Sequence, residues 1–215
     1  VPVFIDAEET WIQDTIDSIT LDMMRKYNTQ KTIVYNTLQM YRHDRIEYLE
    51  RMMDLSKKEN FHYGVKLVRG AYMEKERLRA SQNAYPSPIQ PDKNSCDTDF
   101  NKALEITCEH IDHAALCAGS HNEKSAIILV ELMEKYSIEP NDSRICFAQL
   151  LGMSDHISYN MAYHGYNVAK YVPYGPIKEV MPYLLRRADE NTSVAGQTGR
   201  ELNLIIKERK RRASK

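Results

Sequence analysis

Short apolar runs rich in β-branched residues alternate along the chain with longer segments of helical periodicity. The runs predict strands, because each is short and is bounded by polar or turn-forming residues. They lie at 1–6, 31–37, 63–70, 114–120, 144–150 and 167–173. Apolar residues recur at helical spacing between most of them, notably over 11–26, 45–57, 123–136 and 177–190. This alternation predicts parallel strands joined by helical crossovers.

One interval departs from the regular repeat of about thirty residues. Residues 71–97 begin with a charged, helix-like piece and continue with NAYPSPIQPDKNS. The prolines and polar residues of that stretch predict a loop insertion on the surface.

Polar residues fall at or just past the end of each predicted strand, and they help to choose between a doubly wound sheet and a barrel. They are Asp6, Asn36, Arg69, Ser120 with His121 and Asn122, Gln149, and Tyr171. A barrel brings all such positions into one ring, whereas an open sheet gathers only those beside its switch point. We therefore predict an α/β fold of the (β/α)8 TIM-barrel type.

Only six βα units are visible, where a complete barrel has eight. The sequence opens with VPVFIDAEE, which reads as the interior of a strand and carries no initiator methionine. We expect a barrel truncated at the N-terminus, with its last six units present and any targeting sequence lost.

Lys66 interrupts the otherwise apolar strand YGVKLVRG. Alternation directs its side chain to the face opposite Val65, Leu67 and Arg69. If that face lines the barrel interior, the ammonium needs a paired charge or an anionic ligand. A structural ion pair and a functional site both satisfy this requirement.

The segment AGSHNEKSA leads from small residues directly into a helix that begins near Asn122. Its free N–H groups, with Arg69 nearby in a barrel, would suit a phosphate. Ser120 and Asn122 are also ordinary helix caps, and His121 is compatible with a structural role. Since no second histidine stands at ligand spacing, we expect no metal site.

The final periodic segment, 177–190, presents two faces. Pro176 suits the first turn of the helix, and its apolar stripe comprises Ile177, Val180, Met181, Leu184 and Ala188. The opposite face carries Tyr183, Arg186, Arg187 and Glu190. On an outer helix this face would meet water, whereas across a barrel mouth the two guanidinium groups could hold a carboxylate. Periodicity does not choose between these placements.

Composition narrows the classes of function. The formal net charge of -1 and pI near 6.7 give no electrostatic reason to expect a nucleic-acid partner. The basic run KERKRR (207–212) is interpreted first as a solvated tail, with anionic lipid or nucleic acid as the lesser alternative. The four cysteines form no CxxC motif, so we expect reduced thiols in an intracellular compartment.

Seven motifs, in order, resemble the proline dehydrogenase family of flavoenzymes. They are DAEE (6–9), VYNTLQMY (34–41), VKLVRGAY (65–72), GSHN (119–122), FAQLLGM (147–153), YVPYGP (171–176) and YLLRRADEN (183–191). The resemblance covers essentially the whole chain. The YPSPIQP loop and the phrase QLLGM are more similar to the mitochondrial, eukaryotic branch than to the bacterial one.

The resemblance implies non-covalent FAD above the mouth of the barrel, with the last helix closing over it. By this resemblance Arg186 and Arg187 bind the substrate carboxylate. The pocket for the pyrrolidine ring is formed by Glu190, Tyr183, Tyr171 and Leu150. Asp6 corresponds to the active-site aspartate at a strand end, and Lys66 to the basic residue beside flavin N5. The implied catalytic set is Asp6, Lys66, Tyr171, Arg186, Arg187 and Glu190.

The same resemblance assigns the cofactor contacts. The FAD phosphate and ribityl region maps to Arg69, Ala71, Ser120, His121 and Asn122, and the edge of the flavin ring maps to Asn36 and Gln39. Residues 1–200 would form the C-terminal part of the barrel with both sites, and residues 201–215 a basic tail.

The implied reaction is oxidation of L-proline to Δ1-pyrroline-5-carboxylate, the first step of proline catabolism. Hydride would pass from C5 of proline to FAD, and electrons onward to ubiquinone. The implied location is the matrix side of the mitochondrial inner membrane, with a peripheral membrane contact.

Three alternatives remain at this point. Hydroxyproline dehydrogenase shares the motifs, but its counterpart of Tyr171 tends to be smaller and polar, so Tyr171 favours proline. A non-catalytic relative is disfavoured by the retained charge cluster of Lys66, Arg186, Arg187 and Glu190. A phosphate-binding barrel without flavin would leave the paired arginines without a ligand. Because the family also uses a lysine from an early strand, we expect the isolated 215 residues to be a fragment with poor activity.

Overall fold

The computed structural model describes residues 1–193, 205–207 and 209–213, and it forms two compact units. The first unit is Val1–Tyr171 and the second is Val172–Lys215. Each is described by itself below. The expected boundary between residues 200 and 201 lies outside the described residues.

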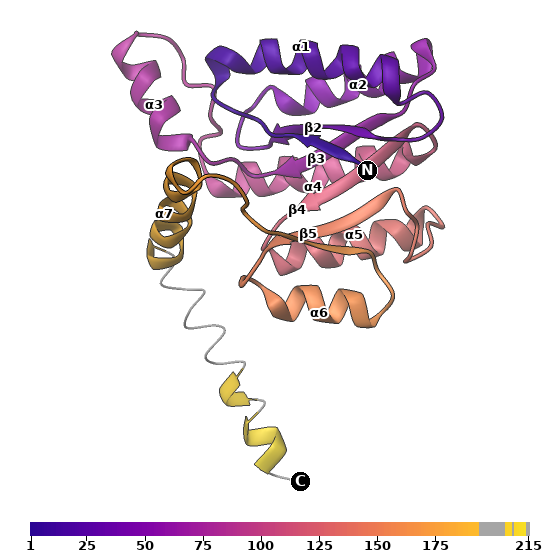
Figure 1. Ribbon diagram of the computed structural model, residues 1–215, viewed down its shortest axis with the longest axis vertical. Helices are drawn as coiled ribbons and strands as arrows, with labels where there is room; N and C mark the ends of the chain where they lie inside the picture. Colours follow the sequence, from indigo (N-terminus) through magenta and orange to yellow (C-terminus); the bar gives the residue numbers. More distant parts are fainter. Residues whose placement is uncertain (194–204, 208, 214–215) are drawn as a thin grey trace. The chain divides into compact units, whose positions relative to one another are not determined.

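The first unit is built on one six-stranded parallel sheet (Figure 1). Its strands are β1 (Val3–Ile5), β2 (Val34–Gln39), β3 (Tyr63–Val68), β4 (Ala114–Gly119), β5 (Ile145–Leu150) and β6 (Val168–Tyr171). Each strand pairs with its neighbour in sequence, in the order β1 to β6. Right-handed crossovers that always step in the same direction place every helix on the same side of the sheet. The order is that of a barrel, because a doubly wound sheet reverses direction at its switch point.

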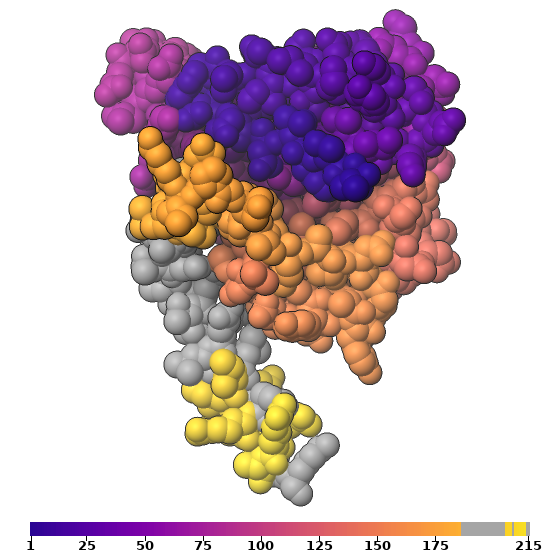
Figure 2. Space-filling model, in the orientation of Figure 1, coloured from indigo at the N-terminus to yellow at the C-terminus, as the bar shows by residue number. Residues whose placement is uncertain are grey.

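The strand order runs from β1 to β6. In Figures 1 and 2 the first helix, α1 (indigo), lies at one end of this unit and α6 (orange) lies at the other. The helices that follow the strands are α1 (Thr10–Tyr27), α2 (Arg45–Glu59), α3 (Met73–Gln82), α4 (Lys93–Glu109), η1 (Ile111–His113), α5 (Glu123–Lys135) and α6 (Asp155–Tyr163). None of the described helices is long and apolar enough to span a membrane.

The core lies between the helices and one face of the sheet. Alternate strand residues supply one layer, and among them are the buried Leu38, Leu67, Leu116 and Phe147. The helices supply the other layer, with fully buried side chains that include Leu49, Met53, Phe100, Leu104 and Leu129. Burial of each such side chain contributes about 1.5–3 kcal/mol. The strand residues between them therefore point to the opposite, inner face.

The surface insertion is shorter than the sequence predicted. The expected loop NAYPSPIQPDKNS ends at Asp92, whose side chain accepts a hydrogen bond from the Ser95 N–H at 2.8 Å and so caps α4. The rest of the loop is held to the end of β2, since the Gln90 N–H donates to the Tyr41 carbonyl at 2.6 Å. Because Asp92 caps the helix, α4 begins at Lys93 although the residues of its first turn have a turn-like composition.

A buried charge network joins α1, β2 and α2. Arg45 lies at its centre: its guanidinium donates to Asp17 at 2.9 Å and to Asp44 at 2.6 Å. Asp17 also accepts from the Asn36 amide at 2.8 Å, and Arg42 donates to Asp44 at 2.6 Å. The side chains of Arg45 and Asp17 are only 5% and 7% exposed. Such a pair stabilises the fold only while both partners are present.

This network predicts a loss of stability in acid. Burial opposes the charged form of Asp44, but hydrogen bonds from Arg45 and Arg42 lower its pKa to about 2. The folded pKa is below that of an unfolded aspartate, about 3.9. The contribution is therefore full above about pH 4 and is lost as the pH falls toward 2. Denaturation midpoints measured between pH 5 and 2 should fall less steeply in Asp44→Asn than in the native protein. Equal slopes would contradict the prediction.

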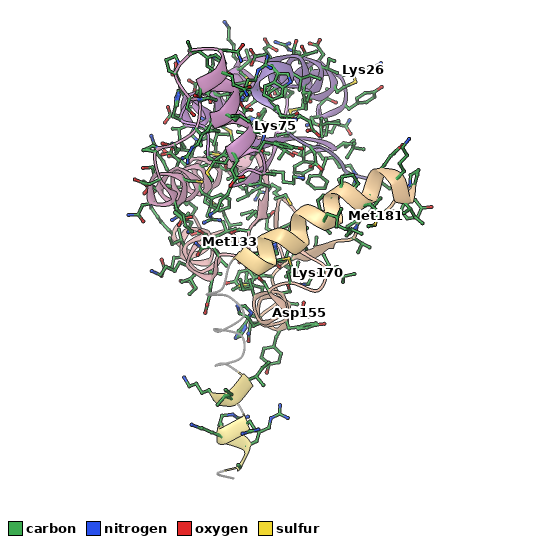
Figure 3. The ribbon with its side chains drawn as sticks, turned by 90° about the vertical axis from the view of Figure 1, so that its left-hand side faces the viewer. Lys26, Lys75, Met133, Asp155, Lys170 and Met181 are labelled. Carbon is green, nitrogen blue, oxygen red and sulfur yellow. The ribbon has the colours of Figure 1, made fainter. Side chains whose placement is uncertain are left out.

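The edge strand β6 is fastened to α6 by a side chain. Lys170 donates through Nζ to the Met153 carbonyl and to the Asp155 carboxylate, both at 2.8 Å (Figure 3). The lysine thus anchors the last strand on the helix side, away from the inner face.

The second unit contains α7 (Ile177–Ser193). Pro176 precedes the helix rather than entering its first turn, and its carbonyl accepts from the Glu179 N–H at 2.9 Å. The apolar side chains that the sequence predicted for one face of α7 lie beside residues 173–175, which precede the helix. Together they line a hollow of about 170 Å³ formed by Pro173, Tyr174, Gly175, Ile177, Val180, Met181 and Leu184.

Candidate active site

The inner face of the sheet carries a row of chemically active side chains. Strand register aligns Thr37 of β2 with Lys66 of β3, Lys66 with Cys117 of β4, and Cys117 with Cys146 of β5. In-register residues of parallel strands project to the same side. All four side chains therefore leave the sheet opposite the helix-packed core, as alternation predicted for Lys66.

Lys66 forms an ion pair with Asp6, which follows β1 directly. The Thr37 hydroxyl lies 3.5 Å from the same carboxylate oxygen. The side chain of Lys66 is 17% exposed and that of Asp6 is 57% exposed. The buried ammonium group of Lys66 is thus paired with a carboxylate. Solvent reaches this ion pair from the side of Asp6. Asp6 and Lys66, both members of the predicted catalytic set, therefore lie in contact.

An aromatic pair lies beside these charges. The rings of Phe4 and Tyr35 stack at 4.6 Å between centroids, and Lys66 Nζ lies 6.0 Å from the centre of the Phe4 ring. Burial raises the pKa of Tyr35 to about 12, so its hydroxyl stays protonated at neutral pH. Tyr35 is buried beneath Phe4, so the exposed apolar surface beside the ammonium group is that of Phe4.

Arg69 lies just past β3, on the side of the sheet that faces the helices. Its guanidinium donates to Asp97 at 2.6 Å, Ser120 at 2.6 Å and Ser125 at 3.0 Å. Its Cζ atom also lies 4.4 Å from the centre of the Phe100 ring. Arg69 therefore joins β3 to α4 and α5, and the positive charge predicted for a phosphate is already engaged by Asp97.

The segment before α5 acts as a helix cap. Asn122 Oδ1 accepts from the N–H groups of Lys124 at 2.9 Å and Ser125 at 3.3 Å. His121 Nδ1 lies 3.0 Å from Ser154 Oγ. Behind these residues lies a cavity of about 10 Å³, lined in part by Ser120, Ser125 and Gln149. It is about the size of one water molecule and is too small for a phosphate.

Asn36 and Gln39 lie on opposite faces of β2. The expectation that β2 ends near Asn36 is wrong, because the strand continues to Gln39. Asn36 is mid-strand, faces the helices and binds Asp17. Gln39 is at the strand end on the inner side, and its amide bridges the Glu8 carbonyl at 2.8 Å and the Ala71 N–H at 3.2 Å. Gln39 and Ala71 thus lie together on the inner side at the strand ends, whereas Asn36 is bonded to Asp17 on the helix side.

The far end of the inner face carries two of the residues predicted for the substrate pocket. Leu150 at the end of β5 is in register with Tyr171 at the end of β6. Tyr183 lies in α7, and residues 186, 187 and 190 continue the same helix. The predicted helical spacing is confirmed for the backbone. The side-chain predictions for Arg186, Arg187 and Glu190 lie outside the described residues.

Three members of the inner-face row were not apparent from the sequence, namely Thr37, Cys117 and Cys146. Alternation with Lys66 could have found them, but only after the strands were aligned, and register depends on tertiary structure. Among the described residues no group of three or more acidic, histidine or cysteine side chains could hold a metal ion.

The fold and the site together define a βα-barrel-type protein with its candidate active site on the inner face, at the carboxyl ends of the strands. The family model described as proline dehydrogenase matches residues 1–200. The chain belongs to the proline dehydrogenase family.

Individual relatives agree with this assignment. The chain is 40% identical over 222 residues to mitochondrial proline dehydrogenase 1 of Drosophila melanogaster, covering 99% of this chain and 33% of that protein. It is 38% identical over 216 residues to hydroxyproline dehydrogenase of Xenopus laevis, covering 99% of this chain and 46% of that protein. It thus spans between a third and a half of the length of these two relatives.

A solved structure confirms the fold. The proline utilization A protein of Bdellovibrio bacteriovorus, inactivated by N-propargylglycine, superimposes with a TM-score of 0.83 at 26% identity. The match covers 91% of this chain and 20% of that protein. A barrel-type arrangement, first predicted from the polar residues at strand ends, is thereby confirmed.

The inner face fits a flavin in charge and shape. Lys66 supplies positive charge, and the Phe4–Tyr35 pair supplies a flat wall. Gly119 keeps the surface close to the backbone, because a Cβ atom there would come within 3.0 Å of Val68 Cγ1 and 3.1 Å of the Leu67 carbonyl. A larger residue at this position would force the strand ends apart.

Proposed function

We propose that this chain carries the cofactor and substrate sites of an FAD-dependent dehydrogenase that oxidises L-proline to Δ1-pyrroline-5-carboxylate. The observation that carries the proposal is the Lys66–Asp6 pair on the inner face of a chain whose family match covers residues 1–200. FAD, held without a covalent bond, would supply the hydride acceptor. The alternative of a barrel without flavin would leave the family match unexplained.

Lys66 would stabilise negative charge on the ligand that lies against the inner face. Its own desolvation is offset by Asp6, which is exposed enough to keep part of its hydration. Asp6 thereby holds the ammonium in position, and Thr37 steadies the carboxylate from the neighbouring strand. A preorganised charge of this kind costs no rearrangement at the moment of reaction.

The other proposed cofactor contacts lie at the same ends of the strands. The Ala71 N–H donates a hydrogen bond to Gln39 Oε1, which brings these two residues together. Ser120, His121 and Asn122 form the turn before α5, where the phosphates would bind, and Arg69 donates to Ser120 from the end of β3. Arg69 would act through this turn because its own N–H groups already bind Asp97, Ser120 and Ser125.

By the family resemblance, substrate would be held by residues of β5, β6 and α7. Arg186 and Arg187 would bind the carboxylate as paired guanidinium groups, with C5 directed toward the cofactor. Glu190, Tyr183 and Tyr171 would enclose the ring and its amine, and Leu150 would pack against its apolar side. α7 brings positions 183, 186, 187 and 190 to one face of the helix.

The test is the visible spectrum of the purified protein, recorded before and after anaerobic addition of L-proline. Flavin bands that bleach with L-proline support the proposal. In Arg186→Met we expect the proline concentration for half-bleaching to rise about 10- to 100-fold, because a hydrogen bond to a charged group contributes about 1.5–3 kcal/mol. Lys58→Met, which removes an exposed cation from α2, should bleach like the native protein. A preparation without bound flavin would refute the assignment.

Hydroxyproline oxidation is the second candidate, because relatives named hydroxyproline dehydrogenase are nearly as similar as the proline dehydrogenases. Tyr171, at the end of β6, favours proline because its ring fills space that a substrate hydroxyl would need. Bleaching by 4-hydroxyproline but not by L-proline would select the second candidate.

The remaining parts of the proposal concern the cellular setting. A mitochondrial location is supported by relatives whose names include the word mitochondrial. We place it on the matrix side of the inner membrane, with ubiquinone as the electron acceptor and a peripheral membrane contact. Residues 201–215 would form a basic tail beyond the barrel.

A further inference from the structure

Two cysteines of the inner face stand directly opposite each other on neighbouring strands. Cys117 of β4 and Cys146 of β5 are partners in the parallel register. Cys117 is 4% exposed, whereas Cys146 is half-buried. Neither belongs to the helix-packed core, and the proposed dehydrogenase reaction gives neither a role.

The spacing of parallel strands is too wide for an easy disulfide. Neighbouring strands lie about 4.8 Å apart, and in-register side chains leave the sheet in the same direction. Their Cβ atoms are therefore separated by about the same distance. A disulfide needs its Cβ atoms about 3.5–4.5 Å apart. The pair would have to draw the two strands together to form one.

The same spacing suits two thiolates that bind one ion between them. A zinc–thiolate bond is about 2.3 Å long, so two such bonds in line place their sulfur atoms about 4.6 Å apart. Soft thiolate ligands suit Cu(I), Zn²⁺ and Fe–S clusters, and of these Cu(I) is the ion that commonly completes its coordination with two ligands. The sulfur of Cys146 lies 3.7 Å from the Phe147 carbonyl, a long contact that is easily given up.

The charges around the pair favour a thiolate-bound monovalent ion. Lys66 is the register partner of Cys117 on the other side. Two thiols that lose their protons to solvent and bind Cu(I) carry a net charge of -1, which the ammonium partly neutralises.

We propose that Cys117 and Cys146 form a two-coordinate site for a soft monovalent cation, Cu(I), on the inner face beside Lys66. The ion would reach Cys146 first and then Cys117 beneath it. The site stands on strand register and spacing, and it does not depend on the identity of the substrate.

The test is anaerobic titration of the reduced, purified protein with Cu(I) in competition with a colorimetric Cu(I) chelator. We expect one Cu(I) per chain, with sulfur as the only ligand by X-ray absorption. Cys117→Ser, Cys146→Ser and Cys146→Ala should each weaken binding at least 100-fold, because one thiolate remains. Cys96→Ser and Cys108→Ser change buried thiols elsewhere in the fold and serve as matched controls with unchanged affinity.

Circular dichroism of each variant separates loss of the site from loss of the fold. Folded Cys146→Ala protein that binds Cu(I) as tightly as the native protein would overturn the proposal. So would ready formation of a Cys117–Cys146 disulfide with a thiol oxidant while the protein stays folded, because the sulfur atoms would then be too close for a linear ion.

Discussion

Exchange of Lys66 for methionine is expected to slow the reduction of bound flavin by L-proline about 100- to 1000-fold. That is the usual cost of removing one preorganised electrostatic group from an active site. Methionine keeps the length of the side chain and removes the charge. Asp6, which is 57% exposed, can be hydrated when its partner is lost, so the fold should survive. Stopped-flow absorbance of the flavin band gives the rate.

Two comparisons show whether the charge itself is responsible. Lys66→Arg keeps the positive charge and should retain most of the rate, whereas Lys66→Met should not. Asp6→Asn tests positioning: it should slow flavin reduction while leaving flavin bound. A rate in Lys66→Met within threefold of the native rate, at an unchanged thermal midpoint, would remove Lys66 from the proposed mechanism.

The largest expected loss of stability is in Arg45→Met. This change leaves the Asp17 carboxylate buried, 7% exposed, without its cationic partner. Removing one partner of a buried pair costs about 3–5 kcal/mol, because an uncompensated charge remains in the interior. Asp44 also loses two of its hydrogen bonds. Urea denaturation followed by circular dichroism should show a much lower midpoint.

Arg25→Met is the matched control. Arg25 pairs with Glu59 at 2.6 Å, but the two side chains are 40% and 35% exposed. An exposed ion pair is screened by water and stabilises little, so its loss should leave the midpoint almost unchanged. Equal losses in the two variants would show that burial does not determine the value of these pairs.

The sequence alone predicted the main elements because their signals are local. All six strands and four of the helices lie close to where periodicity placed them. Periodicity did not predict α4 or α6. The predicted loop also extended over the first turn of α4, because the polar residues of that turn resemble a loop. The side of the sheet taken by Lys66 also followed from alternation. Asn36 was assigned to a strand end because the apolar run stops there, although β2 continues through polar residues to Gln39.

The sequence by itself determined the order of strands and helices, the face of each strand that carries charge, and the resemblance of its motifs to proline dehydrogenases. These features depend on residues close together in the chain. Tertiary structure decided which residues meet: Lys66 with Asp6, Asn36 with Asp17, and Cys117 with Cys146. Such partners are 60, 19 and 29 residues apart, and only the strand register and the packing of helices on the sheet bring them together.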